Sequence, residues 1–211
     1  MTNQEEVWDK IAPEWDNYRN VTPLVVEEFV YGKKGKILDL GCGSGRNFIP
    51  GGDLKWYGVD FSKGMIELAK DNSYKKGMEV ELFKKEVYKT DFENNKFDYI
   101  ICYSVLHCIE TIGKRIDTLK EIFRLLRPNG EVLISVWGRK SLRLIGKNKE
   151  SFVPWKLSNG RKVMRFTYLF DKKELEDLAK RIGFEIIKSN EDENIVIILR
   201  KPLINKPDHN N

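Results

Sequence analysis

Acidic residues and glycines stand together in this sequence at a place where they could hold a small ligand. The run Leu38-Asp39-Leu40-Gly41-Cys42-Gly43-Ser44-Gly45 puts a carboxylate directly before a glycine-rich turn. Glycines let the backbone turn sharply and let a ligand approach the main chain. A carboxylate beside this turn would repel a pyrophosphate, but it would attract a ligand that carries a free ammonium group. The motif therefore favours a zwitterionic cofactor over a dinucleotide.

Two further acids follow where such a cofactor would need them. Asp60 ends the apolar run Trp56–Asp60 and could accept hydrogen bonds from both hydroxyls of a ribose. Glu86 and Val87 follow the run Val80–Lys84 and could face the amino group and a ring nitrogen of adenine. Taken singly, these residues could form a structural turn and solvated strand ends. As an ordered set they predict a site for S-adenosylmethionine (SAM), with cofactor-binding residues Asp39, Gly41, Cys42, Gly43, Asp60, Phe61, Met65, Glu86, Val87 and Ser104.

Placing these residues together requires an α/β fold with a doubly wound, mostly parallel sheet. Apolar runs predict strands at 36–40, 56–60, 80–84, 97–103 and 131–137, and helical periodicity predicts helices at 63–72, 116–126 and 172–182. Two final strands, 184–188 and 195–200, are expected to be an antiparallel pair because a short polar link joins them. Ligands of such sheets bind at the carboxyl ends of the strands, where the acids and glycines stand.

The ends of the chain are expected to add to a single domain over residues 1–200. Residues 1–35 are expected to form a helical lead-in over the cofactor site, because Val7, Trp8, Ile11, Trp15 and Tyr18 recur at helical spacing. Trp8 and Trp15 could belong to the core, could stack on a base, or could do both. Residues 201–211 are polar and are expected to be a disordered tail.

Composition limits the environment of the chain. Its 211 residues are 41% hydrophobic and hold no apolar run of transmembrane length, and the polar start differs from a signal peptide. The three cysteines form no Cys-x-x-Cys pair, which favours reduced thiols in the cytoplasm. A metal site built on Cys102 and Cys108 is the alternative, and we expect no metal.

Positive charge is concentrated in residues 139–165. This stretch holds nine Lys and Arg and one acid, so its net charge is +8. Because the whole chain has a net charge of +5, the remaining residues together carry −3. Aromatic residues interleave or flank it: Trp137, Phe152, Trp155, Phe166 and Tyr168. Basic residues with stacking platforms suit a single-stranded RNA loop, although charged stretches are often only solvated. The expected substrate-binding residues in a basic and aromatic insertion, 139–170, are Trp155, Tyr168, Arg139, Lys140, Arg143, Arg161 and Lys162.

The segments ILDLGCGSGRN, YGVDFSKGMIELA, FDYIICYSVLHCI and EIFRLLRPNGEVLISVW together resemble the class I SAM-dependent methyltransferases. The resemblance spans roughly residues 36–137. It implies a Rossmann-like, seven-stranded sheet whose last strand is antiparallel, in agreement with the pattern of strands above.

Segments outside that core resemble a narrower family. VWDKIAPEWDNYR, Phe152-Val-Pro-Trp155 and Arg165-Phe-Thr-Tyr-Leu-Phe170 are similar to the tRNA wobble-uridine methyltransferases, which esterify 5-carboxymethyluridine. This chain departs from that family at Cys108, where a second histidine is usual, at 166–168, and at Glu86, where aspartate is usual. The resemblance implies tRNA as a partner, and it also implies a small zinc-binding activator protein that adds a strand to the sheet edge.

Methyl transfer to a carboxylate requires alignment more than proton chemistry. A carboxylate with a pKa of about 4 is already ionised at neutral pH, so no general base is needed. Arg19 and Arg165 are the candidates for orienting it, and His107 is expected over the methyl group, although it could be only a strand-end histidine. Two alternatives stay open: a methyltransferase of a small carboxylic or phenolic metabolite, and a catalytically silent RNA-binding subunit.

Overall fold

One seven-stranded sheet organises the chain in the computed structural model, which describes residues 3–141, 146 and 148–203. Its strands lie in the order β3-β2-β1-β4-β5-β9-β8. Their bounds are β1 Lys34–Leu40, β2 Asp53–Asp60, β3 Val80–Lys84, β4 Phe97–Tyr103, β5 Leu126–Trp137, β8 Glu185–Glu191 and β9 Asn194–Arg200. The first five strands pair in parallel, and β9 is antiparallel to both β5 and β8. The expected Rossmann-like sheet with an antiparallel last strand is confirmed.

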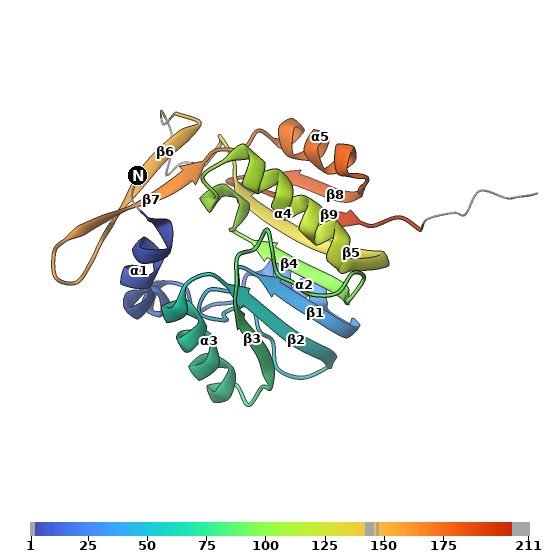
Figure 1. Ribbon diagram of the computed structural model, residues 1–211, viewed down its shortest axis with the longest axis horizontal. Coiled ribbons are helices and arrows are strands. Elements are labelled where there is room, and N and C mark those ends of the chain that lie inside the picture. Colours follow the sequence, from blue (N-terminus) through green and yellow to red (C-terminus); the bar gives the residue numbers. More distant parts are fainter. Residues whose placement is uncertain (1–2, 142–145, 147, 204–211) are drawn as a thin grey trace, which may run out of the picture.

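Helices cover both faces of this sheet (Figure 1). Their bounds are α1 Gln4–Tyr18, α2 Leu24–Val30, α3 Lys63–Lys75, α4 Ile112–Leu125 and α5 Lys172–Ile182. Alternate residues of the strands face opposite sides, as a pleated strand dictates. Leu38 and Ile100 pack into one core with α4 and α5, whereas Ile37 and Ile101 pack into another with α2 and α3. Because both faces are covered, the central strands β1 and β4 carry runs of consecutive buried residues.

The sheet order creates the place for a ligand. β1 lies between β2 and β4, so the chain leaves β1 toward one edge of the sheet and returns on the other side. At such a switch point the connections diverge and leave a crevice at the carboxyl ends of the strands. The glycine-rich turn after β1, Asp60 at the end of β2, and Ser104 after β4 therefore converge there.

A two-stranded hairpin, β6 Glu150–Lys156 and β7 Lys162–Tyr168, lies outside the main sheet and was not expected from the sequence. Figure 1 shows it in orange beside α1, extending past the body of the molecule. It lies within the basic and aromatic insertion, 139–170, that composition predicted. Its exposure alternates along β6, because one face packs and the other meets solvent.

Several boundaries differ from those expected. α4 begins at Ile112 rather than at residue 116, because the Thr111 side chain caps it by accepting a hydrogen bond from Lys114 N. β5 begins at Leu126 rather than at residue 131, so it includes Pro128–Gly130. Lys201 does not belong to a disordered tail: it is buried, and its ammonium donates to Asn95 and to the Leu126 carbonyl. Residues 204–211 lie outside the described residues.

Candidate functional site

A cavity of about 500 Å³ opens at the carboxyl ends of β1, β2 and β4. Such a volume is typical of small-molecule and cofactor sites. Its wall includes the glycine-rich turn, the segment after β3, the start of α3, α1 and β7. Nine of the ten expected cofactor-binding residues line it, namely Gly41, Cys42, Gly43, Asp60, Phe61, Met65, Glu86, Val87 and Ser104. The structure therefore brings together residues that span more than sixty positions of sequence.

The glycine-rich turn after β1 needs glycine for two different reasons. Gly41 and Gly43 both have positive φ angles, of 82° and 53°. A side chain at Gly41 would collide with Val105, so the turn packs directly on the connection after β4. A Cβ at Gly43 would instead point into open space, with only Trp15 Nε1 nearby at 3.7 Å. That open space belongs to the cavity and suits a ligand that lies against the main chain.

Asp39 is the expected cofactor residue that does not line the cavity. Its carboxylate is fully buried and accepts hydrogen bonds from Asn47 Nδ2, at 3.3 and 3.1 Å. Burial raises the pKa of Asp39 to about 7. Asn47 does line the cavity, and its Oδ1 has no hydrogen-bond partner among the described residues. Asn47, which the sequence reasoning missed, is therefore the group that Asp39 holds in place, and direct contact of Asp39 with a cofactor stays a prediction.

Asp60 ties the glycine-rich turn to the start of α3. It accepts hydrogen bonds from Gly43 N at 2.9 Å and from Ser62 N at 3.0 Å, and burial raises its pKa to about 6. Phe61 and Met65 follow it into the cavity wall. An acid with apolar neighbours is the combination that a ribose with an attached base requires. The unpartnered Asn47 acceptor at one place and this acid at another fit the two ends of SAM.

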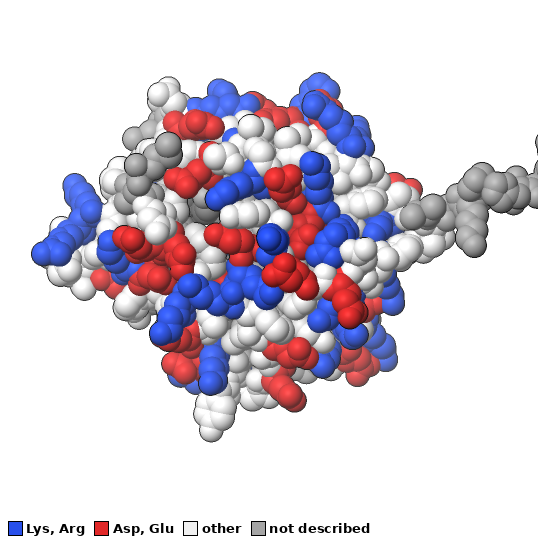
Figure 2. All heavy atoms as spheres, in the orientation of Figure 1, with Lys and Arg blue, Asp and Glu red and all other residues white. Residues whose placement is uncertain are grey.

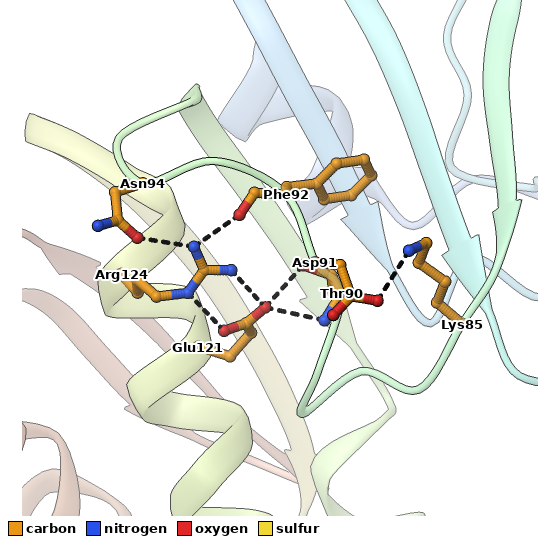
Figure 3. A network of polar contacts seen from close by, with 7 residues as sticks. All are labelled: Lys85, Thr90, Asp91, Phe92, Asn94, Glu121 and Arg124. Carbon is orange, nitrogen blue, oxygen red and sulfur yellow. Dashed lines mark hydrogen bonds and ion pairs between the residues drawn. The ribbon is translucent and has the colours of Figure 1, made fainter.

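The segment after β3 is fixed from behind by a network that Figure 3 shows. Glu121 of α4 accepts hydrogen bonds from both the backbone N and the hydroxyl of Thr90, at 2.9 and 2.6 Å. Arg124 binds the same carboxylate and donates to the Phe92 carbonyl and to Asn94. Glu86 and Val87, which line the cavity, lie at the beginning of the segment that this network holds. The network therefore supports the segment where adenine is expected, and none of its members lines the cavity.

His107 lies in the short helix η1 Leu106–Cys108, directly after β4, and lines the cavity. Its ring stacks on Trp137 with 4.7 Å between centroids, and its Nδ1 accepts a hydrogen bond from Trp137 N at 3.2 Å. Burial lowers the pKa of His107 to about 3. The ring is therefore neutral, with its proton on Nε2, and can only donate a hydrogen bond at that atom.

Three arginines line the same cavity. Arg165 lies between Trp8 and Trp155, with its guanidinium carbon 5.7 and 5.1 Å from their ring centroids, and its Nε has no hydrogen-bond partner among the described residues. Arg19 follows α1 and lies 6.0 Å from the Trp15 ring centroid. Arg46, which the sequence reasoning missed although it ends the glycine-rich motif, lies 5.3 Å from the ring centroid of Tyr103. The pKa of Arg165 is lowered by burial and by the charge of Arg19.

Cys108 also lines the cavity, but it is not a nucleophile at neutral pH. Burial raises the pKa of its thiol to about 12. A thiol must ionise to attack, so this side chain acts there as a small apolar group.

No group of three or more His, Cys, Asp or Glu within the described ranges is arranged to hold a metal ion.

α1 closes the cavity by binding to two different parts of the fold. On one side, Asp9 accepts hydrogen bonds from Ser62 Oγ at 2.6 Å and from Gly64 N at 3.1 Å. On the other, Gln4 Oε1 accepts from Phe166 N at 2.9 Å, and Glu14 accepts from Ser158 N at 2.6 Å. α1 thus lies against the cavity and also contacts the hairpin. Trp8 and Trp15 both line the cavity.

The expected substrate-binding residues are distributed differently. Trp155 packs on Trp15 near the cavity, and Arg161 and Lys162 are exposed at the outer end of the hairpin. Arg139 and Lys140 form ion pairs with Asp171 and Glu191, at 3.0 and 2.9 Å. Arg143 lies outside the described residues.

Tyr168 is not placed to bind a substrate. It is buried, its hydroxyl donates to Glu174, and the Arg115 guanidinium carbon lies 3.8 Å from its ring centroid. With its ring enclosed by Arg115 and Phe170, it has no face left for a base. Its expected role was wrong because residue type alone does not tell which face of a strand is turned inward.

No helix in the described part of the chain has both the length and the apolar character needed to cross a membrane.

Comparison with known proteins gives a match over the part of the chain that holds most of the cavity lining. Residues 37–130 match a family model described as a methyltransferase domain.

Relatives and a solved structure extend this match. A protein of Encephalitozoon cuniculi, named as a candidate methyltransferase, is 27% identical over 179 residues, covering 81% of this chain and 80% of its own. A tRNA (carboxymethyluridine(34)-5-O)-methyltransferase of Xenopus tropicalis is 29% identical over 150 residues, which are 70% of this chain but only 23% of that protein. The crystal structure of a SAM-dependent methyltransferase from Methanosarcina mazei superimposes with a TM-score of 0.68 at 20% identity, covering 87% of this chain and 99% of that one.

Proposed function

We propose that this chain is a SAM-dependent methyltransferase and that it transfers the methyl group to the carboxylate of 5-carboxymethyluridine at the wobble position of a tRNA. The match of residues 37–130 to a methyltransferase-domain model supports the first part of this proposal. When bound, the cofactor supplies a methyl group activated by a sulfonium. The observation that carries the proposal is the half-buried Arg165, which faces the cavity with an unpartnered Nε. A buried guanidinium with a free donor is matched by a carboxylate, which can accept two parallel hydrogen bonds from it.

Acidic and basic side chains both line the cavity. The acids Asp60 and Glu86 lie where ribose and adenine are expected. Three of the cations of the wall are arginines, and Arg165 and Arg46 each lie close enough to Arg19 for its charge to lower their pKa. Like charges gathered in one partly buried place repel one another unless an anion binds between them. This supports an anionic acceptor.

The residues of the cavity suit a transfer without a general base. His107 has a pKa of about 3 and can donate only from Nε2, and Cys108 stays a thiol. A carboxylate acceptor needs no proton removed before it attacks. Its alignment by Arg165 and Arg19, together with exclusion of water by Trp8 and Trp15, is what the chain contributes in this proposal.

The proposal that the acceptor is 5-carboxymethyluridine is supported partly by the name of a similar protein. The Xenopus tropicalis protein is named for methylation of carboxymethyluridine, and this chain spans less than a quarter of it. The exposed cations Arg161 and Lys162 at the outer end of the hairpin support a polyanionic acceptor. A small carboxylate metabolite is the second candidate, since the arginines would serve it equally well.

Mass spectrometry of tRNA nucleosides tests the proposal. Incubating the protein with labelled SAM and tRNA that contains 5-carboxymethyluridine should place label on the methyl ester. Arg165→Gln removes the guanidinium while leaving the SAM site intact, and it should abolish most of the label. Label on a small carboxylic acid from a cell extract, with none in tRNA, would contradict the proposal.

Two companion proposals concern surroundings rather than chemistry. Cys42, Cys102 and Cys108 are all free thiols, which supports a reducing compartment such as the cytoplasm.

β3 forms an edge of the sheet, so a strand from a small zinc-binding activator could pair with it there. Copurification of such a protein with the chain, lost when Pro replaces Glu81 in β3, would support the second proposal.

A further inference from the structure

A second groove lies outside the SAM cavity, between the end of α1 and the hairpin strand β6. Its wall is formed by Tyr18, Arg19, Pro154, Trp155 and Lys156, and it encloses about 410 Å³. Arg19 lines both this groove and the cavity, so the two are neighbours on one surface. The groove therefore lies next to the place where the acceptor is proposed to bind.

One side of the groove is a fixed aromatic wall with an open platform. Trp155 is held by its Nε1, which donates to Glu14 at 3.4 Å, and by Arg165, 5.1 Å from its ring centroid. Tyr18 meets Trp155 at 5.4 Å with an interplanar angle of 89°, yet 68% of Tyr18 is exposed. A large aromatic side chain left this exposed beside a rigid partner is a stacking surface.

The other side of the groove is basic. Lys156 is exposed and forms no ion pair within the described ranges, and Arg161 and Lys162 continue the basic surface around the hairpin turn. Figure 2 shows Lys and Arg atoms at the outer end that Figure 1 assigns to the hairpin. The nearby acid Glu14 is turned to Ser158 N and Trp155 Nε1. Cations on one wall and an aromatic platform on the other match the phosphate and the base of one nucleotide.

We propose that this groove binds the nucleotide next to the acceptor in a single-stranded RNA, with its base on Tyr18 and its phosphate on Lys156 and Arg19. The inference rests on the proposed function, because it needs an RNA acceptor in the cavity. Stacking on an aromatic ring and binding of a phosphate do not involve the hydrogen-bonding edges of a base. The groove therefore accepts any base and contributes affinity rather than sequence specificity.

The test compares two acceptors on the same protein, the 5-carboxymethyluridine nucleoside and a trinucleotide with that base at its centre. Tyr18→Ala should lower kcat/KM for the trinucleotide by about five- to a hundredfold, the range for removal of one stacked base. Its kcat/KM for the nucleoside should stay unchanged. Tyr18→Phe should restore the trinucleotide rate, and Lys156→Ala should lower it with a steeper effect at low salt. Tyr74→Ala and Lys70→Ala, exposed on α3, are the matched controls.

The outcomes separate the groove from the proposed function. If the wild-type protein methylates neither acceptor, the proposed function fails, and this inference fails with it. If it methylates both and Tyr18→Ala leaves their ratio unchanged, only the groove is refuted. An equal loss on both acceptors would also refute it, because that result would mean that Tyr18 only supports α1 over the cavity.

Discussion

At the scale of single residues, burial decides what the ionisable groups of the cavity can do. His107 and Cys108 look like reactive groups in the sequence, but burial keeps one neutral and the other protonated. Arg165 is the opposite case, because a guanidinium stays charged even when it is largely enclosed. In the proposed function, Arg165 therefore offers fixed positive charge and His107 a hydrogen-bond donor, and neither His107 nor Cys108 acts as a base.

Arg165→Lys is the variant that separates charge from geometry. Lysine keeps the positive charge but loses the planar pair of donors and the stacking between Trp8 and Trp155. We expect KM for the acceptor to rise by about ten- to a hundredfold, the magnitude of one hydrogen bond to a charged group. The dissociation constant of SAM, measured by calorimetry, should not change. A matching loss of SAM affinity would contradict the role given to Arg165.

Asp39 should make the protein less stable as the pH rises. Its pKa in the folded state is raised to about 7, above its ordinary value near 4, so between these values the folded state holds the proton that the unfolded state has released. Stability from this group is therefore present at low pH and is lost as the pH rises through about 7. Asp39→Asn keeps a neutral side chain at every pH.

Chemical unfolding at pH 5 and pH 8 measures this effect. The unfolding free energy of Asp39→Asn minus that of the wild type should be more positive at pH 8 than at pH 5. Glu131→Gln is the control in the other direction, because the pKa of Glu131 is lowered, although burial opposes this, by hydrogen bonds from Lys33 and Arg200. An unchanged difference between wild type and Asp39→Asn at the two pH values would show that Asp39 titrates normally.

At the scale of elements, the sequence predicted what depends on local pattern and missed what depends on partners. The strands β1, β2 and β4 carry runs of buried residues, and acids or glycines stand at or just after the ends of β1, β2 and β3, so most of the cavity lining expected to bind the cofactor was predictable. β6 and β7 are half exposed, with polar residues on one face, and their composition resembles a solvated loop. Only their packing against α1 reveals a hairpin. Asn47 was missed because its importance comes from Asp39 behind it.

The Glu121 network gives an element-scale prediction. Glu121→Gln leaves the shape of the side chain but weakens its bonds to Thr90 and Arg124, and so loosens the segment that carries Glu86 and Val87. Loss of such buried bonds costs about 1–3 kcal/mol of unfolding free energy. SAM affinity should fall several-fold although no cavity residue is changed. Asp117→Asn, exposed on the same helix, is the control, and equal SAM affinity in both variants would rule out positioning by Glu121.

At the scale of the whole molecule, folding partly neutralises the basic stretch that stood out in the sequence. Arg139 pairs with Asp171, Lys140 with Glu191, and Lys149 with Asp171 and Glu174. The acids are Asp171, which caps α5, Glu174 in α5 and Glu191 at the end of β8, and all three follow the basic stretch in the sequence. Within the described part of the basic stretch, the exposed cations without an ion pair are Lys156, Arg161 and Lys162, all on the hairpin. The part of this stretch available to a polyanion is therefore smaller than composition suggested, and it lies on the hairpin.

Salt dependence distinguishes these two groups of cations. Removing one cation that binds a phosphate lowers the slope of log affinity against log salt by about 0.7–0.9, because fewer counterions are released on binding. Arg161→Ala combined with Lys162→Ala should therefore reduce the slope for tRNA by up to about 2. Arg139→Ala combined with Lys140→Ala, which removes the same charge, should change it little, because Asp171 and Glu191 already bind these side chains. Equal changes in the two double variants, measured by filter binding from 50 to 200 mM salt, would mean that tRNA displaces those acids and lies along the whole basic stretch.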